Sequence, residues 1–236
     1  MDREHRPSSI TACLKTRPRT WRAPFTLWIL AAYIVCAIIS NTVFHPLSNV
    51  WLERLGFALT DLSPRRGWRL PGSVLLTPGA FHFWFNLVAL GIAVGACEWR
   101  AGVRRTALAF WSVHLGTGII EAIVGLAASR LVNSALLEEL VKLRSVGPSA
   151  GYLACLGVAL TYFSRRFQVY VAGVVGAVLA GTVVWAAFHA RTDPEGLIDA
   201  ATHIMALPLG WWLGARWQRS RSGRRSRLET PRPSGA

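Results

Sequence analysis

Four polar residues of the sequence have the types and spacing of a hydrolytic site: Ser149, His203, His82 and Asn86. Each lies in, or opens, a stretch of the chain that is uncharged or nearly so. Polar side chains in such stretches are costly to bury in a membrane and mark functional sites there. A hydroxyl, two imidazoles and a carboxamide indicate a serine nucleophile, a base and an oxyanion stabiliser held within a membrane.

Ser149 stands in the pentapeptide Gly147-Pro148-Ser149-Ala150-Gly151. Glycine permits unusual backbone angles, and proline suits the first positions of a helix because its missing N–H would be unpaired there. A serine at a helix N-terminus has backbone N–H groups nearby that can stabilise an oxyanion. The same pentapeptide could also simply start a membrane helix with small packing residues.

His203 is the candidate base, and Asp199 lies four residues before it on the same helical face, where it could orient the ring. His82 and Asn86 have the same spacing and present two donors from one face, which suits an oxyanion site. Each feature also has an ordinary explanation. A membrane histidine can be bonded to a backbone carbonyl, and Asp199 can mark the boundary of a span.

Length and composition predict one membrane domain with short tails. The chain has 236 residues, of which 52% are hydrophobic and 16% charged. Six stretches approach the length needed to cross a hydrocarbon layer of roughly 30 Å. They are residues 25–44, 80–97, 106–128, 146–163, 169–190 and 197–215. We therefore predict an all-α protein with a basic tail at 1–24, a six-span domain at 25–215 and a disordered Arg/Ser-rich tail at 216–236.

The distribution of charge predicts the orientation of these spans. The net charge is +14, and 18 of the 26 Lys and Arg fall on one side if the N-terminus is cytoplasmic. This positive-inside bias places both termini in the cytoplasm. It also accounts for the basic tail as a topology signal that meets anionic lipid, so no nucleic-acid partner is predicted. The four cysteines have neither CxxC nor metal-ligand spacing, and we predict no disulfide and no metal site.

With this orientation, the second, fourth and sixth spans all run inward. Ser149, His82 and Asn86 then lie in the outer half of the bilayer, and His203 lies about 9 Å below the start of its span. Small residues at every fourth position predict close packing of the fourth span against the sixth. These residues are Gly147, Gly151 and Cys155 on the fourth span and Ala206, Gly210 and Gly214 on the sixth.

Two loops of the outer side have apolar character. Residues 45–79 are too apolar for a solvated linker, and we expect them to form a substructure against the outer interface. Within residues 135–143, leucines recur at helical spacing and predict a short amphipathic helix.

An ordered set of motifs resembles the rhomboid intramembrane serine proteases. Trp68-Arg69 resembles the loop motif of that family, and the segment from His82 to Asn86 resembles its HxxxN element. The stretch Glu98-Trp99-Arg100-Ala101-Gly102 is similar to the Glu/Gly/Arg element after the second span. Gly147-Pro148-Ser149-Ala150 is similar to GxSG, and the segment from Asp199 to His203 has the DxxxH form of the sixth helix.

The resemblance implies a Ser149–His203 dyad, with His82, Asn86 and the Ser149 N–H as oxyanion donors. It implies an endopeptidase that cleaves membrane-protein substrates without cofactor or metal, in the bacterial cytoplasmic (inner) membrane. It also implies a lateral substrate gate at the fifth span, for which the outward aromatic residues are the candidates. These are Phe85, Trp185 and Phe188, whose ordinary alternative is interfacial anchoring.

Three departures from the family pattern keep a second interpretation open. Ala150 replaces the last glycine of GxSG, Met205-Ala206 replaces a Gly-Gly pair, and Pro208 falls within the sixth span, where it should kink the helix. The chain could thus be a catalytically inactive rhomboid-like protein that binds membrane clients. A small transporter is a third possibility, because His114 and Glu121 are two ionisable residues on one face of the third span.

Overall fold

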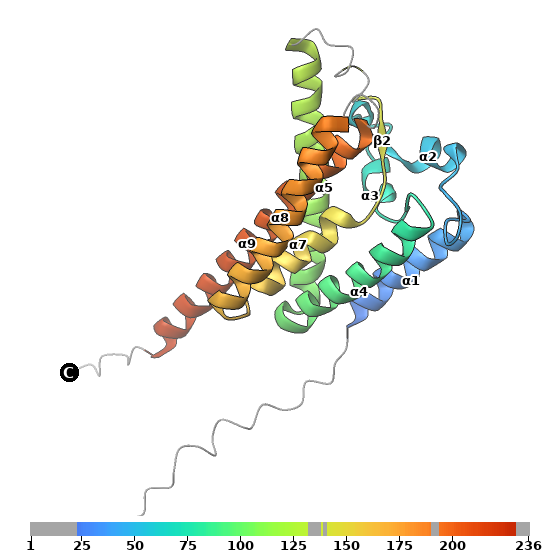
Figure 1. Cartoon of the computed structure of the whole chain (residues 1–236). Coiled ribbons are helices and arrows are strands. Elements are labelled where there is room, and N and C mark those ends of the chain that lie inside the picture. The colour runs from blue at the N-terminus through green and yellow to red at the C-terminus, as the bar shows by residue number, and fades with distance from the viewer. Residues whose placement is uncertain (1–22, 132–137, 139–140, 190–193, 230–236) are drawn as a thin grey trace, which may run out of the picture.

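The computed structural model describes residues 23–131, 138, 141–189 and 194–229. Within these residues, six helices of 12 or more residues form the body of the molecule (Figure 1). They are α1 (Pro24–Ile39), α4 (Phe81–Ala101), α5 (Val103–Leu131), α7 (Ser149–Leu160), α8 (Arg165–His189) and α9 (Pro194–Glu229). Each overlaps one of the six predicted apolar stretches, and the mostly helical fold is confirmed.

Three of these helices, α4, α5 and α8, are long and apolar enough to cross a membrane. Helices α1 and α7 are apolar but shorter, and α7 covers about 18 Å at 1.5 Å per residue. The surface of α8 exposes valines and aromatic rings along its length, and Leu179 and Ala186 are its buried residues. An apolar surface of this extent is expected to face lipid. The protein is therefore a membrane protein, whereas the count of six spans stays a prediction.

Helix α7 is the centre of the bundle. Nearly all of its residues are buried, and α4, α5 and α9 pack around it. Its apolar side chains join Leu90 and Val94 of α4 and Phe110 of α5 in one core. Figure 1 shows α7, α8 and α9 running together, with α1 and α4 paired on the other side. Ser149, the first residue of the central helix, is positioned by every neighbour of that helix.

Helices α7 and α9 approach each other to backbone contact. A Cβ atom on Gly210 would overlap the backbone of Ala154, and one on Gly157 would overlap the carbonyl oxygen of Leu207. A Cβ atom on Gly214 would also lie close to Thr161 and to the backbone of Val158. Small residues allow helix backbones to pack at this distance in lipid. The predicted close packing of these two helices is confirmed, including the small-residue stripe of α9.

The stripe of small residues predicted on α7 lies on a face that does not meet α9. Gly151 lies against the ring of Phe110 on α5, and the Cys155 thiol donates a hydrogen bond to the Thr106 carbonyl oxygen. The face that meets α9 is instead formed by Ala154, Gly157, Val158 and Thr161. Both faces of α7 carry small residues, so spacing alone does not tell which face meets which neighbour.

The loop between α1 and α4 is folded, as predicted. It contains α2 (Asn49–Leu55), β1 (Phe57–Ala58), the 3₁₀ turn η2 (Leu59–Asp61) and α3 (Arg69–Ser73). Strand β1 pairs antiparallel with β2 (Arg144–Ser145), so Phe57 faces Ser145. This two-strand ribbon corrects the all-α prediction. It ties the loop to the segment that leads into α7, at the end of the bundle where α7 begins (Figure 1).

Four predicted segments differ from the structure or fall outside it. Helix α1 ends at Ile39 and the chain then turns, so the span predicted to reach residue 44 is shorter. Helix α9 passes through Pro208 and continues to Glu229, past residue 216, where the C-terminal tail was predicted to begin. The N-terminal tail up to residue 22 and most of the helix predicted at 135–143 lie outside the described residues.

The contact between α7 and α9 makes Gly210 sensitive to the smallest enlargement. We expect Gly210→Ala to lower the free energy of unfolding by about 1–3 kcal/mol, the usual cost of overpacking. Gly173→Ala on α8 is the matched control, because a Cβ there meets nothing within 4 Å. Thermal unfolding of the purified protein in detergent measures both variants. Equal melting temperatures for the two variants would contradict the packing described here.

Candidate active site

Ser149 is the first residue of α7 and is half-buried. Gly147, two residues earlier, has a φ of +134°, which a residue with a side chain rarely adopts. Its N–H donates to the Ser73 carbonyl oxygen at 3.0 Å. Strand β2 and this bond fix the turn before α7, and Pro148 occupies the N-cap position of the helix. The predicted helix start at Ser149 is therefore present.

His203 lies on α9, which runs beside α7 in the same direction. The contacts Ala154–Gly210 and Gly157–Gly210 join residues that are 53 to 56 positions apart in the sequence. Ser149 and His203 are 54 positions apart, so this register brings them to the same level along the two helices. Both residues are half-buried. Both are described, and no hydrogen bond joins their side chains in this structure.

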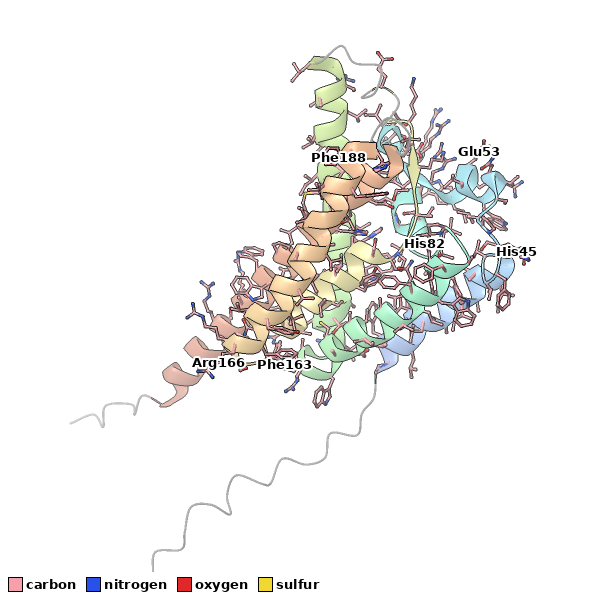
Figure 2. All side chains as sticks on the ribbon, viewed as in Figure 1. His45, Glu53, His82, Phe163, Arg166 and Phe188 are labelled. Atoms are coloured by element: carbon pink, nitrogen blue, oxygen red, sulfur yellow. The ribbon has the colours of Figure 1, made fainter. Side chains whose placement is uncertain are left out.

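The two predicted oxyanion donors have different environments. His82 is exposed in the first turn of α4, at the loop end of the bundle (Figure 2). Asn86 is buried, and its Oδ1 accepts a hydrogen bond from the Tyr152 hydroxyl at 3.3 Å. Asn86 is thus connected to α7 within one turn of Ser149. The sequence analysis missed Tyr152, although its place three residues after Ser149 puts it on a neighbouring face.

Asp199 contacts β2, the strand that precedes α7. Its Oδ1 accepts a hydrogen bond from the Ser145 hydroxyl at 2.8 Å. The carboxylate also stands one helical turn before His203. Asp199 therefore links α9 to β2, a contact that the sequence did not predict. Its predicted role in orienting His203 stays a prediction.

A small polar cavity lies beside Ser149. Its volume is about 40 Å³, and its lining includes Ser149, Asp199, Thr202, Glu121 and His114. A polar cavity of this size has room for water. Ser149 is thereby adjacent to a space that side chains from α5, α7 and α9 share.

His114 and Glu121, the residues that favoured a transporter, each have a structural partner. His114 Nε2 lies 3.2 Å from the Leu70 carbonyl oxygen of α3. The Glu121 carboxylate accepts a hydrogen bond from the Thr202 hydroxyl of α9. Both residues therefore hold neighbouring elements against α5, which explains two costly polar groups in this helix without an ion path.

The three candidate gate residues lie on the outer surface. Phe85 is 56% exposed, Trp185 65% and Phe188 83%. Trp185 stacks on His189 at 4.0 Å between ring centroids, and Phe85 stacks on Phe81. Figure 2 shows Phe188 and His82 at one end of the bundle and Phe163 and Arg166 at the other. The gate residues share the end where α7 begins, and their role stays a prediction.

Asp61 is the centre of an ion-pair cluster that the sequence analysis did not single out. Its carboxylate is fully buried and lies 2.5 Å from Arg144, 3.1 Å from Arg69 and 3.6 Å from Arg66. Arg144 belongs to β2 and also donates to the Gly56 carbonyl oxygen. Arg69, which the Trp-Arg motif had marked, thus acts with Asp61 to join the folded loop to β2.

The charge of Asp61 is stabilised by these partners. Burial alone would raise the pKa of Asp61. Hydrogen bonds from Arg144, Arg69 and the Ala58 N–H, together with the charge of Arg144, outweigh burial and lower this pKa below its ordinary value. The folded loop therefore favours the ionised carboxylate.

Glu98 gives a structural role to the predicted Glu/Gly/Arg element, which lies at the end of the bundle opposite the start of α7. Its carboxylate accepts hydrogen bonds from the Phe25 N–H at 3.1 Å, the Thr26 N–H at 2.8 Å and the Thr26 hydroxyl at 2.6 Å. These are donors of the first turn of α1, which have no partner within their own helix. Glu98 thus caps α1 from the last turns of α4 and holds the first helix against the core.

The contribution of the Asp61 cluster to the stability of the fold can be tested by varying the pH. A lowered folded-state pKa means that Asp61 stabilises the fold above an unfolded pKa of about 3.9, and that this stability is lost as the pH falls through the folded pKa. We expect Asp61→Asn to lower the free energy of unfolding at pH 7 by about 3 kcal/mol. Thermal melts at a series of pH values should also show less acid sensitivity below about pH 4.

The matched control for this test is Glu53→Gln, an exposed carboxylate on α2 in the same loop. We expect this variant to melt as the parent protein does. Equal losses for the two variants would show that general charge, rather than the cluster, holds the loop.

The arrangement described so far defines a helical integral membrane protein with a serine and a histidine at one level of two closely packed helices. A comparison with protein-family models matches the Rhomboid domain over residues 64–219, more than half of the chain. The chain therefore belongs to the rhomboid family, whose members are generally intramembrane serine proteases. A search of curated proteins gave no match.

Proposed function

We propose that this protein is an intramembrane serine endopeptidase with Ser149 as nucleophile and His203 as general base. The observation that carries the proposal is the register of α7 and α9, in which Ser149 and His203 stand at one level beside a seam of backbone contacts. Family membership supports the same reaction class. Direct activation of a serine by a neighbouring histidine is an established form of nucleophilic catalysis.

In the proposed reaction, the Ser149 oxygen attacks the scissile carbonyl carbon while its proton passes to His203. The protonated His203 then gives this proton to the leaving amine as the C–N bond breaks. A water molecule, deprotonated by the same ring, hydrolyses the acyl-enzyme and restores the serine. The nucleophile and the base both belong to the chain, the remaining groups come from the substrate and water, and the proposal includes no cofactor or metal.

The proposed oxyanion donors are the Ser149 N–H, Asn86 and His82. The Ser149 N–H belongs to the first turn of a helix, where N–H groups lack helical partners. Asn86 accepts from Tyr152 through its oxygen, and its amide N–H groups are the donors proposed for an oxyanion. Donors fixed in place before the reaction stabilise the charge of a tetrahedral intermediate.

We further propose the membrane arrangement that the charges indicate: six spans, both termini in the cytoplasm, and a location in the bacterial inner membrane. The folded loop and the starts of α4 and α7 then face outward, at one end of the bundle (Figure 1). Substrates would be membrane-protein segments that reach Ser149 from the bilayer. Asp199 would assist by orienting His203.

A second candidate is a catalytically inactive rhomboid-like protein that binds membrane clients. It is favoured by two observations: the side chains of Ser149 and His203 are not hydrogen-bonded to each other, and Asp199 is bonded to Ser145. Catalytic hydrogen bonds are often long in substrate-free enzymes and tighten in the complex, so the first observation is also compatible with an active enzyme.

The dyad is tested with a fluorophosphonate probe and a transmembrane reporter substrate. We expect Ser149→Ala to abolish probe labelling, and Ser149→Ala and His203→Ala each to reduce cleavage on the order of 10⁴-fold or more. Asn86→Ala should cost on the order of 10²–10³ in rate, because it removes one oxyanion donor. Gel fluorescence and reporter cleavage measure these effects.

The matched control is Ser129→Ala, since this hydroxyl bonds within α5 to the Leu126 carbonyl oxygen, away from the site. It should label and cleave as the parent protein does. Labelling that persists in Ser149→Ala would exclude the proposed nucleophile. A parent protein that neither labels nor cleaves, yet retains a membrane client, would favour the inactive alternative.

The proposed gate is tested by reducing Trp185 and Phe188 to valine. If their rings close a lateral path, smaller side chains should raise cleavage of a membrane-embedded substrate more than that of a soluble one. Tyr170→Leu is the matched control, because Tyr170 is an exposed aromatic residue of α8 near its other end. Equal or lower activity on both substrates, with folding preserved, would count against the gate.

A further inference from the structure

A carboxyl group on α5 forms a hydrogen bond that the proposed reaction does not use. Glu121 lies within a helix that is long and apolar enough to cross the membrane, where a carboxyl is expensive to place. It accepts a hydrogen bond from the Thr202 hydroxyl of α9. Thr202 is the residue directly before His203. The bond therefore joins two distant parts of the chain next to the proposed base.

Apolar packing and side-chain hydrogen bonds both hold this part of α9. The seam with α7 includes Ala206, which is fully buried, and continues through Gly210 and Gly214. On either side of His203, Ala201 and Ile204 are exposed, whereas Ala200 is buried. His203 thus lies beside an exposed surface of α9. The bonds of Asp199 to Ser145 and of Thr202 to Glu121 add to the packing that places it.

The helical period connects the Thr202 bond to the direction of His203. His203 and Gly210 are seven residues apart, about two turns at 3.6 residues per turn, so both lie on the face of α9 that meets α7. Thr202 is about 100° away around the helix, on the side of α5. A bond that keeps Thr202 against α5 consequently sets the rotation of α9 that turns His203 towards α7.

The bond also borders the space beside Ser149. Glu121 and Thr202 both line the 40 Å³ cavity that includes Ser149, together with Asp199. Ser149 has its own anchor, because the Gly147 N–H is bonded to the Ser73 carbonyl oxygen. The nucleophile is therefore fixed from the loop, whereas the outer part of α9 is fixed across the cavity.

From these contacts we infer that Glu121 is a positioning residue for His203, acting through Thr202. The inference rests on the proposed function, in which His203 is the base. Glu121 does not touch the reacting atoms. It fixes the rotation and depth of the start of α9 against α5, and thereby the distance from the His203 ring to the Ser149 hydroxyl. A misplacement of about 1 Å in such a pair can lower the rate on the order of 10²-fold.

The test compares variants that remove the bond with variants that keep it. Thr202→Val and Glu121→Leu remove the donor and the acceptor, whereas Thr202→Ser and Glu121→Gln retain a hydroxyl and an acceptor oxygen. With the transmembrane reporter, we expect the first two to lower kcat by about 10- to 100-fold with KM unchanged. The conservative pair should restore most of the activity.

Thr117→Val is the matched control. Thr117 lines the same cavity, but its hydroxyl bonds to the Val113 and His114 carbonyl oxygens of its own helix. This variant changes cavity polarity without touching the connection to α9, so its kcat should match the parent. The double variant Glu121→Leu/Thr202→Val should lose no more activity than either single variant, because both remove one bond.

A second measurement does not depend on activity. Diethyl pyrocarbonate modifies accessible imidazoles, and mass spectrometry follows the modification of His203. We expect its rate to rise several-fold in Thr202→Val and Glu121→Leu and to stay at the parent value in Thr117→Val. If the parent neither cleaves nor labels at Ser149, the proposed function fails, and the His203 modification rates still decide whether Glu121 positions this ring.

Three outcomes would overturn the inference. One is a loss of kcat in Thr117→Val as large as in Thr202→Val. Another is Glu121→Gln activity as low as that of Glu121→Leu. The third is a His203 modification rate that is the same in every variant.

Discussion

The backbone contact between α7 and α9 is the constraint on which the remaining structure depends. Gly210 lies against Ala154 and Gly157 so closely that neither glycine can carry a side chain without movement of a helix. Contacts between rigid backbones transmit register better than contacts between flexible side chains, because fewer rotamers can absorb a shift. On the proposed function, this seam is what sets His203 and Ser149 at one level although they are 54 residues apart.

Beyond the seam, polar bonds add to the packing of a second apolar cluster, in which Phe57 and Leu70 of the loop meet Ala122 of α5. Asp61 joins the folded loop to Arg144, the neighbouring Ser145 bonds to Asp199 of α9, and Glu121 of α5 bonds to Thr202. A buried polar group without a partner is costly in a low-dielectric interior, so each bond discourages the displacement of the element that it holds. The elements around Ser149 are thus connected through side chains that the loop, β2, α5 and α9 contribute.

Sequence reasoning succeeded where information is local and failed where it depends on which surfaces meet. Apolar length marked the helices, and the glycine and proline before Ser149 marked the start of α7, because chain conformation decides both. The face of α7 that meets α9 was predicted wrongly, since Gly151 and Cys155 are as small as Ala154 and Gly157. Asp61 and Tyr152 were missed for a related reason. The partner that ties Asp61 to β2, Arg144, and the partner of Tyr152, Asn86, come from distant segments, so local sequence does not indicate these contacts.

The combination of a close-packed seam and polar bonds near Ser149 fits the reaction proposed for the site. A peptide substrate needs space at the start of α7, and a fully packed helix pair would leave none. The reaction also needs a fixed distance between Ser149 and His203, which the close-packed seam supplies. The hydrogen-bonded ends of the helices supply the space, since hydrogen bonds can be exchanged for bonds to a substrate more readily than a close-packed core can open. On this view, the half-buried Ser149 and His203 belong where the bundle becomes less tightly packed. A dyad placed deeper, beside Gly157 and Gly210, would have better-defined geometry and no room for a substrate.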